Sequence, residues 1–224
     1  MKQAFDKRFL ATNALLSLTA AVFFAIQMLR VGRTTDAYTI YEFGGLLGYA
    51  IKMDPSQLWR LISPIFVHIG WEHFLFNSLT LYVLGYQVEE LFGWKKFLAI
   101  YLLSGVMGNA FVLYFTPAVV TAGASTSLFG LFDLMALLRY HAKSPHIKAL
   151  GERYVGLLVV NLAISFLTPS ISLTGHLGGL VGGLLCAVMI TPPHEGQLFA
   201  KWQSYLACAL YFVLIGFFIL TIIA

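Results

Sequence analysis

Long apolar runs dominate this sequence and limit what the chain can fold into more than any other feature. A membrane-spanning helix needs about 20 mostly apolar residues. Seven segments reach or approach this length, and polar connections separate them. We predict spans at residues 9–29, 73–92, 97–115, 125–140, 154–167, 171–190 and 199–223. Because these runs are continuous, they predict helices instead of the short alternating strands of a β-barrel.

The composition indicates the same class of protein. Hydrophobic residues make up 59% of the chain and charged residues 11%, whereas a soluble domain has about 25% charged residues. We therefore predict an all-α integral membrane protein, folded as a polytopic helical bundle. The formal net charge is +4, but the basic residues lie between the predicted spans. That placement favours the lipid bilayer as a partner and disfavours nucleic acid.

The lysine and arginine positions also predict the orientation of the chain. With a cytoplasmic N-terminus, ten of the fourteen basic residues fall on the cytoplasmic side, as the positive-inside rule requires. We expect a cytoplasmic segment at 1–8, a six-span core at 9–190, and a linker with a seventh span at 191–224. The C-terminus is then extracytoplasmic, and the protein is a multi-pass protein of the cell membrane. The polar and aromatic stretch at 30–71 is expected to form a structured loop at the membrane interface.

Four polar side chains lie near the outer ends of the even-numbered spans. Ser125 opens the fourth span in a Gly-X-Ser turn, a common way to present a nucleophilic hydroxyl. His176 lies one to two turns into the sixth span, and His73 and Asn77 lie in the first turns of the second. Since these three spans all begin on the outer side, we expect the four residues at one depth, near the outer leaflet.

A hydroxyl and an imidazole at one depth are suited to nucleophilic catalysis. His176 would take the proton from Ser125 and later deliver it to the leaving amine. His73 and Asn77, four residues apart on one helix face, would donate hydrogen bonds to an oxyanion, with the Ser125 backbone N–H as a third donor. We expect no acidic residue at this depth, so the pattern predicts a dyad instead of a triad. Taken alone, a serine in a span is more often a helix-packing residue.

The predicted fourth span is short. From Ser125 to Arg139 a helix extends about 22 Å, less than the roughly 30 Å of the hydrocarbon core. We therefore expect Ser125 below the outer surface and a loop at 116–122 that dips into the protein. Non-helical backbone is tolerated at that depth where it is buried in protein or lines a wet cavity, and hydrolysis needs water. Glycines at 175–183 are expected to let the sixth span pack closely on the fourth.

Other polar residues are interpreted as structural. Trp59 and Arg60 are expected to form an interfacial anchor or a fold-stabilising pair, and His68 to brace its loop. Glu89 and Asp133 are costly in lipid and are expected to make structural hydrogen bonds. His68 and the histidine five residues later are an alternative metal site, but they span a loop-to-helix junction and lack a third ligand. No metal and no cofactor are predicted.

Together these residues resemble the rhomboid family of intramembrane serine proteases. The matching elements are Trp59-Arg60, His68, His73, Asn77, Glu89 before Gly93, the Gly-X-Ser turn at Ser125, and His176 followed by glycines. The resemblance implies Ser125 as nucleophile, His176 as base, and an oxyanion hole that includes His73 and Asn77. It also implies a six-helix core, a partly embedded first loop, a mobile cap at 168–172, and an extra C-terminal helix.

Two positions depart from the family pattern. Thr126 follows the nucleophile where glycine is common, so its side chain is expected to narrow the oxyanion hole. Gly175 precedes the base where alanine is common. Neither change removes a catalytic group, so activity is still expected.

The predicted function is hydrolysis of peptide bonds in or near transmembrane segments of membrane-protein substrates. These substrates would enter laterally, and the active site would open to the extracytoplasmic side. The alternative is a non-proteolytic relative that binds membrane proteins in quality control. A small transporter is a weaker alternative, because the two halves of the chain show no internal repeat.

Overall fold

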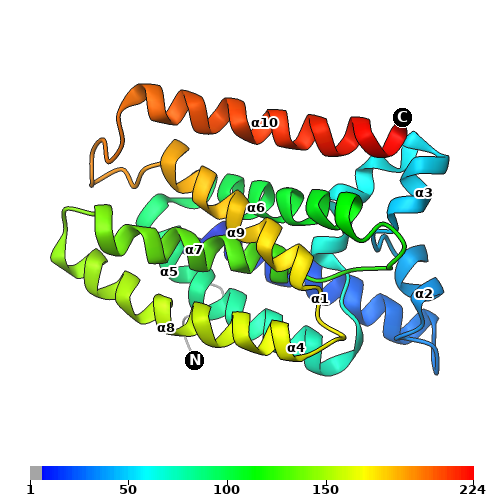
Figure 1. The fold of residues 1–224 in the computed structure, drawn as a ribbon. Helices are drawn as coiled ribbons and strands as arrows, with labels where there is room; N and C mark the ends of the chain where they lie inside the picture. The colour runs from blue at the N-terminus through cyan, green and yellow to red at the C-terminus, as the bar shows by residue number, and fades with distance from the viewer. Residues whose placement is uncertain (1–6) are drawn as a thin grey trace.

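The computed structural model describes residues 7–224, and nearly all of them belong to helices or to short connections between helices (Figure 1). The α-helices are α1 (Leu10–Leu29), α2 (Ala37–Glu42), α3 (Gly48–Met53), α4 (Gly70–Thr80), α5 (Tyr86–Phe92), α6 (Trp94–Phe115), α7 (Ser125–His141), α8 (Pro145–Leu167), α9 (Leu173–Met189) and α10 (Lys201–Ile223). The short turns are η1 (Lys7–Phe9), η2 (Pro55–Leu61), η3 (Ser63–Phe66) and the π-helical η4 (Leu81–Gly85). The predicted all-α polytopic fold is confirmed.

The helices differ in whether they are long enough to cross a bilayer. Within the described residues, α1, α6, α8 and α10 are long and apolar enough to do so. Helices α7 and α9 have 17 residues each, about 25 Å, which is less than the roughly 30 Å hydrocarbon core. Helices α4 and α5 are joined by η4 into one helical stretch over residues 70–92. The fourth span is therefore short, as the sequence predicts, and the sixth is short as well.

Several helix boundaries differ from the sequence prediction, and two of the differences have a local explanation. The fifth span was expected to begin at Tyr154, but α8 begins at Pro145, where proline occupies the first turn and is well suited to it. The third span was expected to begin at residue 97, but α6 begins at Trp94, directly after Gly93, whose φ of 76° lies in the left-handed region. Hydropathy marks the apolar part of a helix, whereas helical hydrogen bonding continues beyond it.

Helices α6, α7 and α9 form the centre of the bundle. The most extensive helix contacts join α6 to α9 and α7 to α9, while α8 packs on α7 and α10 packs on α6 and α9. A Cβ added to Gly179 would overlap the carbonyl oxygen of Thr126, and one added to Gly183 would overlap the backbone of Gly130. The backbones of α7 and α9 therefore touch, which is the close packing predicted from the glycines.

The direction of the helices in the bundle brings the starts of two central helices to one end. In Figure 1, α7 and α9 run opposite to α6, α8 and α10, so their first residues lie at the same end of the molecule. That end also carries the C-terminal turns of α8. The fold thus places residues from α7, α8 and α9 within reach of one another, although they are far apart in sequence.

The loop at residues 116–124, between α6 and α7, is held by the segment between α1 and α4. Leu46 and Thr121 form an antiparallel bridge with N···O distances of 2.8 and 2.9 Å. The N–H of Gly123 donates to the carbonyl of Pro64 at 2.9 Å. These backbone groups are therefore paired within the protein, which is the condition for non-helical backbone at membrane depth.

Arg60 lies at the centre of the segment between α1 and α4. It is 5% exposed and donates from Nη1 to the carbonyls of Tyr41 and Gly45, at 2.6 and 2.9 Å. Its guanidinium carbon lies 3.9 Å from the ring centroid of Tyr41 and 4.3 Å from that of Trp59. One cation thus connects α2, the turn after it and η2.

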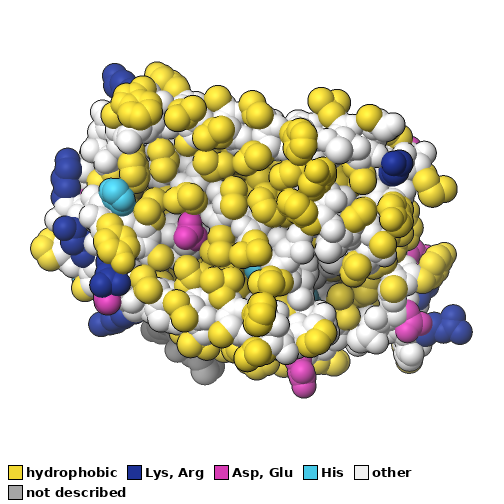
Figure 2. All heavy atoms as spheres, in the orientation of Figure 1, with side chains coloured by type: hydrophobic (Ala, Val, Ile, Leu, Met, Phe, Trp, Pro, Cys, Tyr) yellow, Lys and Arg dark blue, Asp and Glu magenta, His cyan; other side chains and the backbone are white. Residues whose placement is uncertain are grey.

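The molecular surface is divided between apolar and charged regions. In Figure 2, lysine and arginine side chains gather toward two opposite ends, and hydrophobic side chains cover most of the face between them. Large apolar residues are openly exposed on several helices, among them Phe24, Leu79, Val159 and Phe212. A soluble monomer rarely exposes so continuous an apolar surface, so this face is one that lipid covers.

Candidate active site

Ser125 is the first residue of α7, and a constrained glycine places it there. Gly123 has φ of 133°, a backbone conformation that glycine adopts most readily. A Cβ at Gly123 would lie 2.7 Å from Nε2 of His73 and 3.6 Å from Oγ of Ser125. The imidazole of His73 and the hydroxyl of Ser125 therefore border the same small space.

His73 presents a hydrogen-bond donor to that space. Its Nδ1 accepts a hydrogen bond from the Ile69 N–H at 3.3 Å. A neutral imidazole that accepts at Nδ1 carries its hydrogen on Nε2, and Cε1 and Nε2 are the ring atoms beside Gly123. The ring therefore presents Nε2–H to the space that it shares with Ser125.

Asn77 lies one turn further along α4 and is 6% exposed. Its side-chain nitrogen donates to the carbonyl of His73 at 2.8 Å. An asparagine amide has two N–H groups, so this bond fixes the side chain and uses one of them. The structure places Asn77 next to His73, on the face predicted from their spacing.

His68 supports the turn before Ser125 through a hydrogen bond to its backbone. It is fully buried, and its Nε2 accepts a hydrogen bond from the Ala124 N–H at 3.3 Å. Burial, with a smaller contribution from neighbouring His73, lowers the pKa of His68 to about 3. The ring therefore remains neutral and keeps a lone pair for the backbone of the turn.

His176 lies at the start of α9 and is 5% exposed. Its ring stacks on Phe129, with centroids 4.0 Å apart and an interplanar angle of 17°. Phe129 follows Ser125 by four residues on α7, and residues at that spacing share a helix face. The stacking therefore places the imidazole along the surface of α7 that also carries Ser125.

Sequence reasoning missed one residue at this site. Ser165 of α8 lies with its Oγ 2.7 Å from Nδ1 of His176 and donates to the carbonyl of Asn161 at 2.7 Å. The predicted dyad rested on the absence of an acidic partner for the imidazole, and a hydroxyl partner was not predicted. The available signal was a pair of polar residues, Asn161 and Ser165, four apart in an otherwise apolar run.

The side chain of Thr126 was expected to narrow the oxyanion hole, but it packs between helices. It is 6% exposed, and its side chain occupies the space beside two glycines of neighbouring helices. A Cβ at Gly108 of α6 would lie 2.6 Å from Cβ of Thr126, and one at Gly175 of α9 would lie 3.2 Å from its Cγ2. The threonine side chain therefore fills the junction of α6, α7 and α9. Its role there is helix packing.

The two intramembrane acids behave differently. Glu89 accepts three hydrogen bonds at the start of α1, from the N–H of Ala11 and from the N–H and hydroxyl of Thr12. The expected structural hydrogen bond is not found at Oδ2 of Asp133, which is buried without a partner among the described residues. Asp133 follows Ser125 by eight residues, about 12 Å along the helix.

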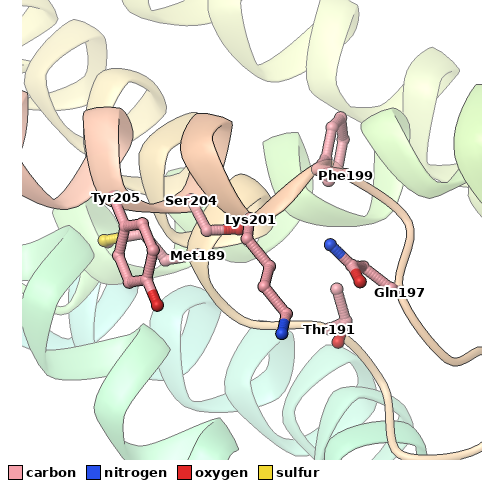
Figure 3. A pocket seen from close by; sticks show the side chains of 7 residues that line it. All are labelled: Met189, Thr191, Gln197, Phe199, Lys201, Ser204 and Tyr205. Atoms are coloured by element: carbon pink, nitrogen blue, oxygen red, sulfur yellow. The ribbon is translucent and has the colours of Figure 1, made fainter.

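Two cavities in the described part of the structure lie away from Ser125. One, of about 310 Å³, lies between the end of α9 and the start of α10 (Figure 3). It is lined by Met189, Thr191, Gln197, Phe199, Lys201, Ser204 and Tyr205. The other, of about 300 Å³, is an apolar groove between α1 and α6. Among the described residues, no three metal-binding side chains cluster as a metal site would require.

The fold and these residues define a class of protein. It is a multi-pass helical membrane protein in which a serine at a helix start and a buried histidine come from adjacent central helices. The sequence model of the rhomboid domain matches residues 55–193, more than half of the chain. The chain therefore belongs to the rhomboid family.

Several known proteins are similar to this chain. Rhomboid protease GluP of Bacillus subtilis (strain 168) is 31% identical over 185 residues, which cover 83% of this chain and 36% of GluP. Putative rhomboid protease YdcA of the same strain is 32% identical over 156 residues, 66% of this chain and 75% of YdcA. Rhomboid-like protease 3 of Toxoplasma gondii is 31% identical over 144 residues, 62% of this chain and 55% of that protein. These names support a protease, and the match spans about a third of GluP.

Proposed function

We propose that this protein is an intramembrane serine endopeptidase that hydrolyses peptide bonds in or near transmembrane segments of other membrane proteins. In this proposal Ser125 is the nucleophile and His176 is its base. The observation that carries the proposal is the stacking of the buried His176 ring on Phe129, one turn after Ser125. The family membership supports the same reaction.

The chemistry follows from the atoms at the site. Nε2 of His176 accepts the proton of Ser125 as Oγ attacks the carbonyl carbon of the substrate. The tetrahedral intermediate collapses when the imidazolium delivers that proton to the leaving amine. Water then takes the place of the amine, and the same base activates it to release the second product. Both half-reactions use one imidazole, so a dyad is sufficient.

The oxyanion of the intermediate needs donors that are already in place. Nε2–H of His73 is aimed at the space beside Ser125, because Nδ1 of that ring accepts the Ile69 N–H. The backbone N–H of Ser125 and the second N–H of Asn77 complete the proposed set. His68 holds the turn at Ala124, from which the Ser125 N–H projects.

The bilayer determines how a substrate reaches the site. We propose that transmembrane substrates enter laterally and that the site opens to the extracytoplasmic side of the cell membrane, with the N-terminus cytoplasmic and the C-terminus outside. A peptide bond in an intact helix is shielded, so the cleaved segment must unwind locally. In this arrangement residues 9–190 are the catalytic core, and residues 191–224 add a linker and α10.

A cleavage assay tests the proposal. Purified protein in liposomes is incubated with a membrane-anchored model substrate, and product is followed for the wild type, Ser125→Ala and His176→Ala. We expect product from the wild type and a rate near background in both variants. Undiminished cleavage by either variant rules out the dyad. Binding of the substrate without product in all three proteins favours the quality-control alternative.

A further inference from the structure

The hydroxyl of Ser165 makes a contact that the proposed dyad does not use. Ser165 lies on α8, is 4% exposed, and meets Nδ1 of the 5% exposed His176 at 2.7 Å. Nδ1 is the ring nitrogen opposite the one that would accept the proton of Ser125. A buried polar contact to that nitrogen determines which nitrogen of the imidazole carries the hydrogen.

The hydrogen positions follow from a count of donors. A serine hydroxyl has one hydrogen, and Oγ of Ser165 lies 2.7 Å from the carbonyl of Asn161. A carbonyl can only accept, so this hydrogen belongs to the bond with Asn161. Oγ must then accept at its other contact, and Nδ1 of His176 must be the donor. The neutral ring consequently carries its hydrogen on Nδ1 and a lone pair on Nε2.

We propose that Ser165 is a positioning residue that holds His176 in the tautomer able to accept a proton. This inference rests on the proposed function. The chain of hydrogen bonds runs from Nδ1–H of His176 to Oγ of Ser165, and from its O–H to the carbonyl of Asn161. No covalent bond changes along this series of hydrogen bonds. The proton abstracted from Ser125 stays on Nε2 until it is delivered to the leaving amine.

Two contacts from different helices then fix the position and orientation of the His176 ring. Phe129 of α7 contacts its face, and Ser165 of α8 contacts its edge. A stacked ring can still rotate in its own plane or exchange its nitrogens, and the hydrogen bond to Ser165 prevents this. Ser165 also accepts the hydrogen bond of the imidazolium that forms during the reaction, so its contribution grows when the ring becomes charged.

The strength of the hydrogen bond between Ser165 and His176 limits how far the loss of Ser165 can lower the rate. Because a hydrogen bond to a charged group contributes more than a neutral one, we expect Ser165→Ala to lower kcat by about 10- to 100-fold. KM should change little, since Ser165 contacts Nδ1, the ring nitrogen that does not take the proton of Ser125 in the proposed reaction. Ser165→Thr keeps the hydroxyl and should retain most of the wild-type rate.

The test combines kinetics with a spectroscopic readout of the tautomer. The full chain labelled with ¹⁵N-histidine is compared with Ser165→Ala, Ser165→Thr and the matched control Ser204→Ala. The Ser204 hydroxyl also donates to a carbonyl, that of Val188, at 2.9 Å, but lies at the other end of α9. His176→Ala identifies the resonances of His176. We expect Nδ1–H in the wild type, the Thr variant and the control, and a loss of that preference in Ser165→Ala.

The outcomes separate this inference from the proposed function. A wild-type ring that carries its hydrogen on Nε2 overturns the role of Ser165. So does a Ser165→Ala variant whose tautomer and kcat equal those of Ser204→Ala. A tautomer change in Ser165→Ala, with no proteolysis even by the wild type, overturns the protease and keeps Ser165 as the residue that positions His176.

Discussion

Glu89 of α5 binds Thr12 at the start of α1 through two hydrogen bonds, 2.8 Å from the backbone N–H and 2.6 Å from the hydroxyl. The first N–H groups of a helix have no partner within the helix, and a negative charge is favourable at that end. A carboxylate from another span therefore caps α1 and ties it to the core. Glu89, an acidic residue in a predicted span, therefore acts as a helix cap and has no direct part in the proposed chemistry.

This relationship predicts a loss of stability without a loss of catalytic competence. Glu89→Ala should destabilise the protein by about 2–4 kcal/mol, since three hydrogen bonds to a charged group disappear. Thr12→Val, which removes only the hydroxyl donor, should cost less, about 1 kcal/mol. Thermal unfolding in detergent measures both, and activity per folded molecule should remain near that of the wild type. Equal melting temperatures for Glu89→Ala and the wild type would contradict this account.

The contact between α7 and α9 predicts a strong effect at one glycine. Gly179→Ala places a methyl group against the carbonyl of Thr126, and overpacking of this kind typically costs about 1–3 kcal/mol. Because the helices would separate beside His176, activity should fall together with stability. Gly156→Ala on α8 is the matched control, since nothing lies within 4 Å of the added atom. That variant should be neutral or slightly stabilising. If both variants melt alike, the backbones do not touch as described.

Arg60 should be irreplaceable by lysine. A lysine keeps the charge but loses the planar group that bonds the carbonyls of Tyr41 and Gly45 and stacks on two rings. We expect Arg60→Lys to cost about 2–3 kcal/mol and to speed proteolytic cutting within residues 30–71. Arg30→Lys is the control, because its ion pair with Glu42 is solvent-exposed and such pairs contribute little to stability. Similar cutting rates in the two variants would refute the role given to Arg60.

The proposed oxyanion donors predict a change in kcat. His73→Ala and Asn77→Ala should each lower kcat by about 10²- to 10³-fold, the usual cost of one such donor, with KM little changed. His73→Ala should be the more severe, because Asn77 already uses one N–H on the backbone. Steady-state kinetics with a membrane-anchored substrate measures both constants. A rise in KM at constant kcat would instead make these residues substrate-binding groups.

Much of this architecture could be predicted from the chain because the bilayer imposes simple rules. Apolar runs predicted the helices, and the distance from Ser125 to Arg139 predicted a short α7. Common helix direction predicted that residues of spans two, four and six would meet, and the structure brings His73, Ser125 and His176 to one end of the bundle. The glycines of α9 predicted its close contact with α7.

The remaining features depend on contacts that periodicity does not encode. The start of α8 at Pro145 follows from helical hydrogen bonding beyond the apolar run. The contact between Ser165 and His176 depends on how α8 packs on its neighbours, and a serine in a span has many possible partners. The position of Thr126 between two glycines is likewise a property of three helices together. In each case the residue type was visible, but its partner was not.

The most direct test of the central claim is covalent labelling of Ser125. The wild type, His176→Ala and Ser125→Ala are treated with a fluorophosphonate probe in liposomes, and the modified residue is located by mass spectrometry. A nucleophilic serine activated by His176 predicts the adduct on Ser125 in the wild type, slow labelling in His176→Ala and none in Ser125→Ala. Labelling that persists in Ser125→Ala, or a wild type that does not react, would contradict the assignment of Ser125 as the nucleophile.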